Sequence, residues 1–351
     1  MPSERTSGLR GLRTLVKGAK EATRARYGQK AASAPAPTKS LRWNVTKGKN
    51  LPSHYELENP VQINDMQEKV AARLTDCLRD RSIAAQFDDS NAEATCRTFC
   101  QTVYMIRLFS AKDPGRTVVE IQRRKGCCLQ FRLERKALIS AAKGESSQCE
   151  KRPNLDIPDF LANQIPAPSD EHIRITLENT AKELSNTSRG RESQMFQLQL
   201  LASMTDLKKS HAATCHKIAN MIMEGGDIRT ICLNMLVSGT SDDLSKMIKL
   251  YALLTISNCM DCIDNSSNTN NVVEDDVWFS EQLYPVLLEN LKKCECPHGA
   301  CLISRCLTHL LKNCSGLRDR REQLEPLKDA MAWGRESHKN LYDEARRALQ
   351  C

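Results

Sequence analysis

Residues 228–258 read IRTICLNMLVSGTSDDLSKMIKLYALLTISN, and this stretch decides the fold of the second half of the chain. Its first part carries apolar side chains at the spacing of one helical face: Ile228, Ile231, Cys232, Met235 and Leu236. Gly239 ends this helix, and the sequence TSDD at 240–243 supplies capping side chains for a second one. The second helix, from Leu244 to Asn258, is apolar almost all round, so it needs neighbours on every side.

The same helical pattern extends over residues 169–351. Apolar side chains at helical spacing predict further helices over residues 172–184, 192–206, 215–222, 277–291 and 301–311. The charged segment 318–350 keeps only narrow apolar stripes, which suits a capping helix with a polar outer face. We therefore expect an all-α domain of stacked helices.

A weak internal repeat lies within this region. Residues 198–206 (LQLLASMTD) are similar to residues 250–258 (LYALLTISN) at an offset of 52, with a fainter copy at 306–314. Together with Gly225, Gly226, Leu233 and Leu236, these segments resemble armadillo repeats, a family of helical arrays. That resemblance implies a groove that binds an extended peptide along the third helix of each repeat. The offset exceeds the usual repeat length of about 40–47 residues, so the repeats are degenerate and a generic bundle is the alternative.

Residues 65–143 have a different periodicity. Asp65 is expected to cap a helix, and short strands are expected over 103–109 (VYMIRLF), 117–122 (TVVEIQ) and 127–133 (CCLQFRL). A helix follows over 136–142. The pattern predicts a small α+β module with three or four antiparallel strands and one covered sheet face.

The module resembles the kinase-associated C-terminal domain of the microtubule-affinity-regulating kinases. The matching positions are Val119, Ile121, Arg123, Gly126 and Phe131. The resemblance implies that basic side chains bind anionic phospholipid headgroups, and the candidates here are Arg107, Lys112, Arg116, Arg123, Arg124 and Lys125. The sequence shows no kinase motifs, so we do not expect autoinhibition of a kinase in cis.

The basic character of the chain belongs to residues 1–54. This segment has twelve Lys or Arg against two Glu, a net charge of +10, whereas the whole chain is +8. This segment has a basic amphipathic stripe followed by the Pro/Ala linker 31–38. It is compatible with a solvated arm, a segment that binds an anionic lipid surface, a mitochondrial transit segment or a segment that contacts nucleic acid. A second linker containing proline is expected over 144–168.

One cluster resembles a metal site by composition: Cys294, Cys296, His298 and Cys301. Its spacing is not a common zinc spacing, and residues 297–299 also fit an ordinary turn between helices, so a metal is not favoured. No catalytic motif is present, and we expect no cofactor and no enzymatic activity. The sixteen cysteines lie mostly in helical apolar patterns, without a secretion signal, which indicates reduced thiols in a cytosol-like compartment.

The sequence therefore predicts a non-enzymatic binding or scaffold protein. Its helical domain would hold a protein partner, and its α+β module would contact an anionic membrane, so the expected location is cytoplasmic or membrane-peripheral. The alternative is a structural subunit of a larger complex, with the basic arm meeting nucleic acid.

Overall fold

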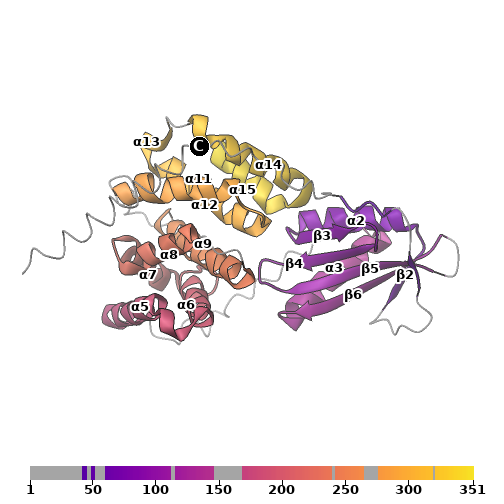
Figure 1. The fold of residues 1–351 in the computed structure, drawn as a ribbon, viewed down its shortest axis with the longest axis horizontal. Helices are drawn as coiled ribbons and strands as arrows, with labels where there is room; N and C mark the ends of the chain where they lie inside the picture. Colours follow the sequence, from indigo (N-terminus) through magenta and orange to yellow (C-terminus); the bar gives the residue numbers. More distant parts are fainter. Residues whose placement is uncertain are drawn as a thin grey trace, which may run out of the picture. The chain divides into compact units, whose positions relative to one another are not determined.

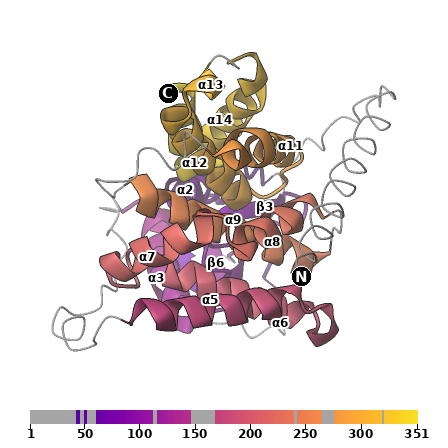
Figure 2. The same ribbon diagram turned by 90° about the vertical axis from the view of Figure 1, so that its left-hand side faces the viewer.

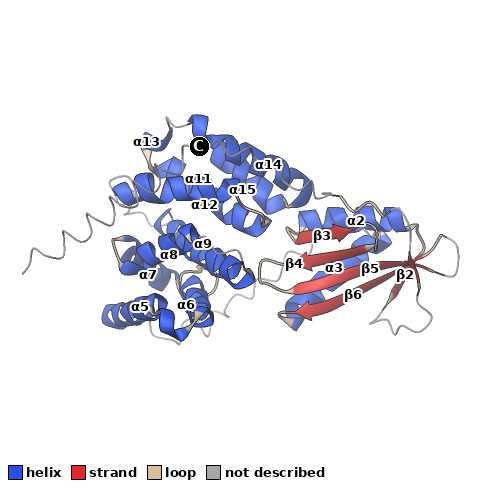
Figure 3. Ribbon diagram, viewed as in Figure 1, coloured by secondary structure: helices blue, strands red, loops and turns tan. Residues whose placement is uncertain are grey.

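The computed structural model describes residues 42–45, 49–51, 60–111, 115–145, 168–238, 242–264, 276–318 and 321–351. Most of the predicted arm, most of the 144–168 linker and Lys112 lie outside these ranges. Within them, all strands precede Gly126 and only helices follow (Figure 3). The prediction of a small sheet followed by an all-helical region is confirmed.

The N-terminal part is an α+β module, the region from Arg42 to Glu145. Its elements are β1 (Lys49–Asn50), β2 (Val61–Ile63), α2 (Gln67–Asp80), β3 (Ala84–Asp88), β4 (Glu93–Arg97), β5 (Val103–Ser110), β6 (Thr117–Lys125) and α3 (Cys128–Lys143). The strands form one sheet in the order β2-β6-β5-β4-β3, with every neighbouring pair antiparallel. Strand β1 adds a short parallel pairing to the end of β5. Helices α2 and α3 pack against each other and against the sheet (Figure 1).

Alternate residues of the central strands build the module's core, because neighbouring strand residues point to opposite faces. The buried strand residues include Ala94, Cys96, Tyr104, Ile106, Leu108, Val119 and Ile121. They share one core with Leu74 of α2 and Leu138 of α3. Trp43 belongs to the same core and stacks on Phe87 at 5.7 Å between ring centroids. The module therefore includes residues that precede its predicted start at residue 65.

The strand predicted over 127–133 is wrong, because these residues begin helix α3. Gly126 turns the chain with φ of +97°, and a Cβ there would lie 2.5 Å from the Cα of Thr102. After this turn the buried positions are Glu134, Leu138 and Ala142, which follow a helical spacing. The alternation in CCLQFRL does not reflect burial, since Leu129 is 67% exposed.

The described residues from Pro168 onward form the helical region. Its main helices are α5 (Asp170–Ser185), α6 (Arg191–Met204), α7 (Ala212–Met223), α8 (Asp227–Val237), α9 (Asp243–Asp264), α11 (Tyr284–Lys292), α12 (Pro297–Asn313), α14 (Glu325–Ser337) and α15 (Lys339–Leu349). Short turns join some of them: η1 (Thr187–Arg189), η2 (Trp278–Leu283), α13 (Ser315–Arg318) and η3 (Arg321–Leu324). The helices predicted from periodicity are present, except that the capping helix expected over 318–350 is instead two helices, α14 and α15, separated at His338. The first helix begins with Ser169, whose side chain accepts a hydrogen bond from the backbone N–H of His172.

These helices are arranged in two rows. Consecutive helices pair as α5–α6, α8–α9, α11–α12 and α14–α15, and the pairs stack on one another (Figures 1 and 2). We call α6, α9, α12 and α15 the inner row, because each packs against the next; α5, α8, α11 and α14 form the outer row in the same way. Helix α7 is an addition that packs on α9. One continuous apolar core runs through the stack, so the helices depend on one another.

Candidate functional site

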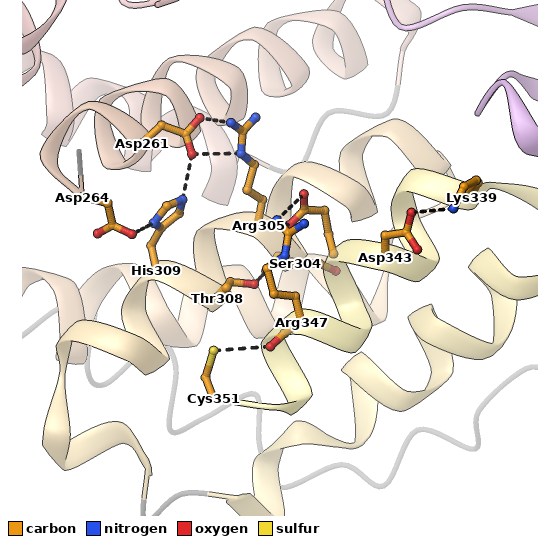
Figure 4. A network of polar contacts seen from close by, with 11 residues as sticks. Asp261, Asp264, Ser304, Arg305, Thr308, His309, Lys339, Asp343, Arg347 and Cys351 are labelled. Atoms are coloured by element: carbon orange, nitrogen blue, oxygen red, sulfur yellow. Dashed lines mark hydrogen bonds and ion pairs between the residues drawn. The ribbon is translucent and has the colours of Figure 1, made fainter. Parts of the chain in front are cut away.

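A group of polar side chains lies where the last turn of α9 meets the second half of α12 (Figure 4). Helix α9 supplies Asp261 and Asp264, three residues apart, and α12 supplies Arg305, His309 and Asn313 at four-residue intervals. Side chains at these spacings share one face of a helix. Because α9 packs against α12, the two faces come together. We call these five residues the α9–α12 polar cluster.

Every member of the cluster has a partner on the other helix. The Arg305 guanidinium donates to both carboxylate oxygens of Asp261, with its Nε at 3.0 Å. His309 bridges the two acids: its Nε2 lies 2.8 Å from Asp261, and its Nδ1 bonds with Asp264. The Asn313 amide donates to the other oxygen of Asp264. The cluster therefore ties the inner-row helices α9 and α12 together through side chains alone.

The contacts between its side chains set the electrostatics of the cluster. An ionised carboxylate only accepts hydrogen bonds, so a ring nitrogen of His309 that bonds with Asp261 or Asp264 acts as the donor. Burial acts to raise the pKa of Asp264, but His309, Asn313 and the nearby Lys312 charge outweigh it and leave that pKa below its ordinary value. The pairs balance one another's charge in a partly buried position.

This arrangement suits recognition better than proton transfer. A general base needs a ring nitrogen with a free lone pair directed at the substrate. Both nitrogens of His309 are held by carboxylates. The Arg305 side chain is 37% exposed, and that of His309 is 12% exposed. A partner chain that bound here could form ion pairs with the charged side chains and hydrogen bonds with the Asn313 amide in place of those within the cluster.

Further ion pairs lie on α15, the next helix of the inner row (Figure 4). Lys339 pairs with Asp343 at 3.0 Å, and Arg347 donates to both oxygens of Glu344 at 3.0 and 3.1 Å. The Cys351 thiol donates to the carbonyl oxygen of Arg347 at 3.3 Å. The C-terminal half of the inner row is thus lined with paired charges.

The first helix of the inner row, α6, has a different surface. Phe196 and Leu200 lie one turn apart and are 63% and 46% exposed. Asn258, which stands at the helix position matched to the armadillo pattern, is buried and donates to the carbonyl of Ala202 at 2.9 Å. It therefore joins α9 to α6 and does not face solvent.

The basic candidates of the module fall into two groups. Arg123, Arg124 and Lys125 are exposed where β6 ends, and Arg123 donates to the Gly126 carbonyl at 2.7 Å. Arg116, just before β6, is also exposed. Arg107 differs, because it lies between two carboxylates, with Glu93 at 3.4 Å and Glu120 at 3.2 Å. Its charge is balanced within the sheet.

The candidate metal ligands do not converge. The Cys294 thiol donates to the Cys296 carbonyl at 3.2 Å, and His298 is turned away into a different contact. Among the residues the structure describes, no three His, Cys, Asp or Glu side chains are grouped as ligands for a metal ion. Burial raises the pKa of Cys301 to about 12, which opposes the thiolate that a metal requires.

His298 instead belongs to the junction between the module and the helical region. Its Nε2 donates to the Arg97 carbonyl at 3.0 Å, and its Nδ1 lies 3.1 Å from Nε2 of His338. Nδ1 of His338 accepts the backbone N–H of Leu341, so the proton on Nε2 of that ring is directed at His298. Both rings are neutral in this chain of hydrogen bonds, and both are buried.

Comparisons of the chain with family models, curated proteins and solved structures returned no match. No helix in the described ranges is long and apolar enough to span a membrane.

Sequence reasoning did not identify the α9–α12 polar cluster. Arg305, His309 and Asn313 show the four-residue spacing of one helix face, which is a usable signal. The helix expected to end at Asn258 continues through Asp264, which adds the turn that carries Asp261 and Asp264. Only the packing of α9 against α12 reveals that the two sets meet.

Proposed function

We propose that this protein is a non-enzymatic binding or scaffold protein that holds an extended segment of a protein partner along the inner row. The binding surface would run across α9, α12 and α15. The single observation that carries the proposal is the α9–α12 polar cluster, which presents paired charges on consecutive helices of one row.

The two-row arrangement supports an armadillo-like or HEAT-like array. The inner-row helices begin at Arg191, Asp243, Pro297 and Lys339. The repeated sequence covers the end of the first helix and the two residues after it (198–206) and the middle of the second (250–258). In armadillo proteins the equivalent helices line the peptide groove. An extended peptide has one donor and one acceptor per residue, and side chains such as Asn313 and Arg305 are suited to pair with them. Recognition by such a surface needs no cofactor.

The test is selection of peptides from a random library on the purified full-length protein. Peptides that bind would be measured by fluorescence polarisation against the wild type and Arg305→Glu. Reversing this charge places three carboxylates together, so we expect at least a tenfold loss of affinity, equivalent to about 1.4 kcal/mol.

The matched control is Arg174→Glu. Arg174 lies on the outer-row helix α5 and pairs with Glu171 and Glu178, so it has the same residue type and a similar ion-pair environment. Peptides that lose affinity with Arg305→Glu but not with Arg174→Glu support the inner row. Equal binding by all three proteins, or no selected peptide, would count against it.

Anionic phospholipid binding by the module is a second proposal, supported by the exposure of Arg123, Arg124 and Lys125 at one end of β6. Each basic residue near an anionic bilayer contributes about 1 kcal/mol. Changing all three to Glu should abolish co-flotation with vesicles containing phosphatidylserine. The double variant Lys69→Glu/Lys143→Glu, which changes cations on α2 and α3, should keep it. Flotation that survives the triple change would remove the module's lipid role.

A further inference from the structure

Two buried cysteines converge at the C-terminal end of α6. Cys215 of α7 lies 3.4 Å from the carbonyl oxygen of Met204, and Cys262 of α9 lies 3.5 Å from the carbonyl oxygen of Thr205. These acceptors belong to consecutive residues, so the two sulfur atoms are held beside each other. Each of the two side chains is close enough to shift the pKa of the other.

The environment assigns the two thiols different roles. The neighbouring Cys262 side chain lowers the pKa of Cys215, although burial opposes this, and the hydroxyl of Ser210 lowers it further. The neighbouring Cys215 raises the pKa of Cys262, whose thiol keeps its proton and donates to the Thr205 carbonyl. Cys232, a buried cysteine on α8, shows the contrast, since burial raises its pKa to about 12. Thiolate character at Cys215 favours reaction with oxidants.

A pocket of about 200 Å³ lies next to this pair, separated from it by the residues of its wall. Met204 and Ser210 line it, together with Thr214 and Ile218 of α7. The Met204 carbonyl and the Ser210 side chain also interact with Cys215, so the same two residues line the pocket and border the cysteine. One water molecule occupies about 30 Å³ in the liquid, so the pocket admits a small hydroperoxide.

We propose that Cys215 and Cys262 are a modification site at which a hydroperoxide forms a disulfide between α7 and α9. The Cys215 thiolate attacks one peroxide oxygen, the O–O bond breaks, and the alcohol or water leaves with a proton. This gives a sulfenic acid on Cys215. The sulfur of Cys262 then attacks that of Cys215, the S–O bond breaks, and the hydroxyl leaves as water with the proton of Cys262. Two thiols are oxidised by two electrons, and one peroxide is reduced.

The test uses reduced full-length protein treated with hydrogen peroxide, with the remaining thiols blocked by N-ethylmaleimide. Tryptic digestion without reduction releases Cys215 in SHAATCHK (residues 210–217) and Cys262 in the peptide 250–292. We expect these two peptides to be linked by mass, with fragmentation placing the bond at Cys262. Cys262→Ser should instead leave a sulfenic acid on Cys215 that dimedone labels.

Two controls keep the outcome clear. Cys232→Ser removes a buried thiol outside the pair and should leave the linkage unchanged, while circular dichroism confirms that each serine variant folds. Exposed Cys100, Cys127 and Cys128 report the extent of oxidation. A bond at Cys259, or no 210–217 linkage once the exposed thiols are oxidised, would overturn the proposal.

Discussion

The two regions of the molecule use ion pairs in opposite ways. In the module, Arg81 and Glu134 pair at 2.6 Å with side chains only 8% and 0% exposed. In the helical region, the pairs of the α9–α12 polar cluster lie at the edge of the core and are partly open to solvent. A buried pair is costly to break because one charge is left without compensation, whereas an exposed pair exchanges readily with water. Only the second kind of ion pair is available to a partner.

Replacing Arg81 with Met should give the largest effect. Glu134 accepts from Arg81 and from Gln130 at 2.6 Å each, and loss of Arg81 leaves a carboxylate buried beside Tyr104. We expect a loss of about 3–5 kcal/mol in the free energy of unfolding, measured by urea denaturation. The double variant Arg81→Met/Glu134→Leu should recover most of it, because neither charge then remains. A small loss in the single variant would contradict the difference between the regions.

His338→Ala tests whether the regions unfold together. The change removes the side-chain cap of α15 and the hydrogen bond that His338 makes with His298 at 3.1 Å. A helix cap and a buried hydrogen bond each contribute about 1 kcal/mol, so we expect a loss of about 2 kcal/mol.

The readout for His338→Ala is hydrogen exchange followed by mass spectrometry. If the junction couples the regions, peptides from α2 and the turn at residues 98–102 should exchange faster in the variant, as well as peptides from α15. Ser82 accepts a hydrogen bond from the backbone N–H of Asn340 at 2.8 Å, so one contact between the two regions remains in the variant. Faster exchange confined to α15 would indicate that the regions unfold independently.

The sequence predicts the helices of the second region well for a physical reason. Each helix buries one stripe in a continuous core, so periodicity alone locates it. Local sequence predicts the module less well, because the seven residues from Cys127 alternate in polarity while their burial is set by the turn at Gly126. It does not predict the α9–α12 polar cluster. Asp261 and His309 are 48 residues apart, and their contact depends on how two helices pack, which no local pattern encodes.

His309→Ala should have a smaller effect than either change above. The ring is partly exposed and its removal leaves Arg305 on Asp261 and Asn313 on Asp264. Neither carboxylate is then left without a partner, so the unfolding midpoint in urea should move only slightly. His309→Gln keeps hydrogen-bonding capacity without charge and serves as the control. A loss as large as that of Arg81→Met would mean that the cluster holds the array together and is not free to bind.

The smallest effect concerns pH and separates charge from packing at the cluster. The folded pKa of Asp264 is lowered, because bonds with His309 and Asn313 and the Lys312 charge outweigh burial. A carboxyl whose pKa is lowered on folding adds stability above its unfolded pKa, near 3.9, and loses it as the pH falls through the folded value. The stability difference between wild type and Asp264→Asn should therefore be larger at pH 7 than at pH 3, measured by urea unfolding. Asp343→Asn, which removes a carboxylate on α15 paired with exposed Lys339, is the control for the substitution itself. If the stability difference between wild type and Asp264→Asn is the same at both pH values, the substitution acts through shape or hydrogen bonding and not through charge. The cluster would then stabilise the fold by packing, as the interior of the module does.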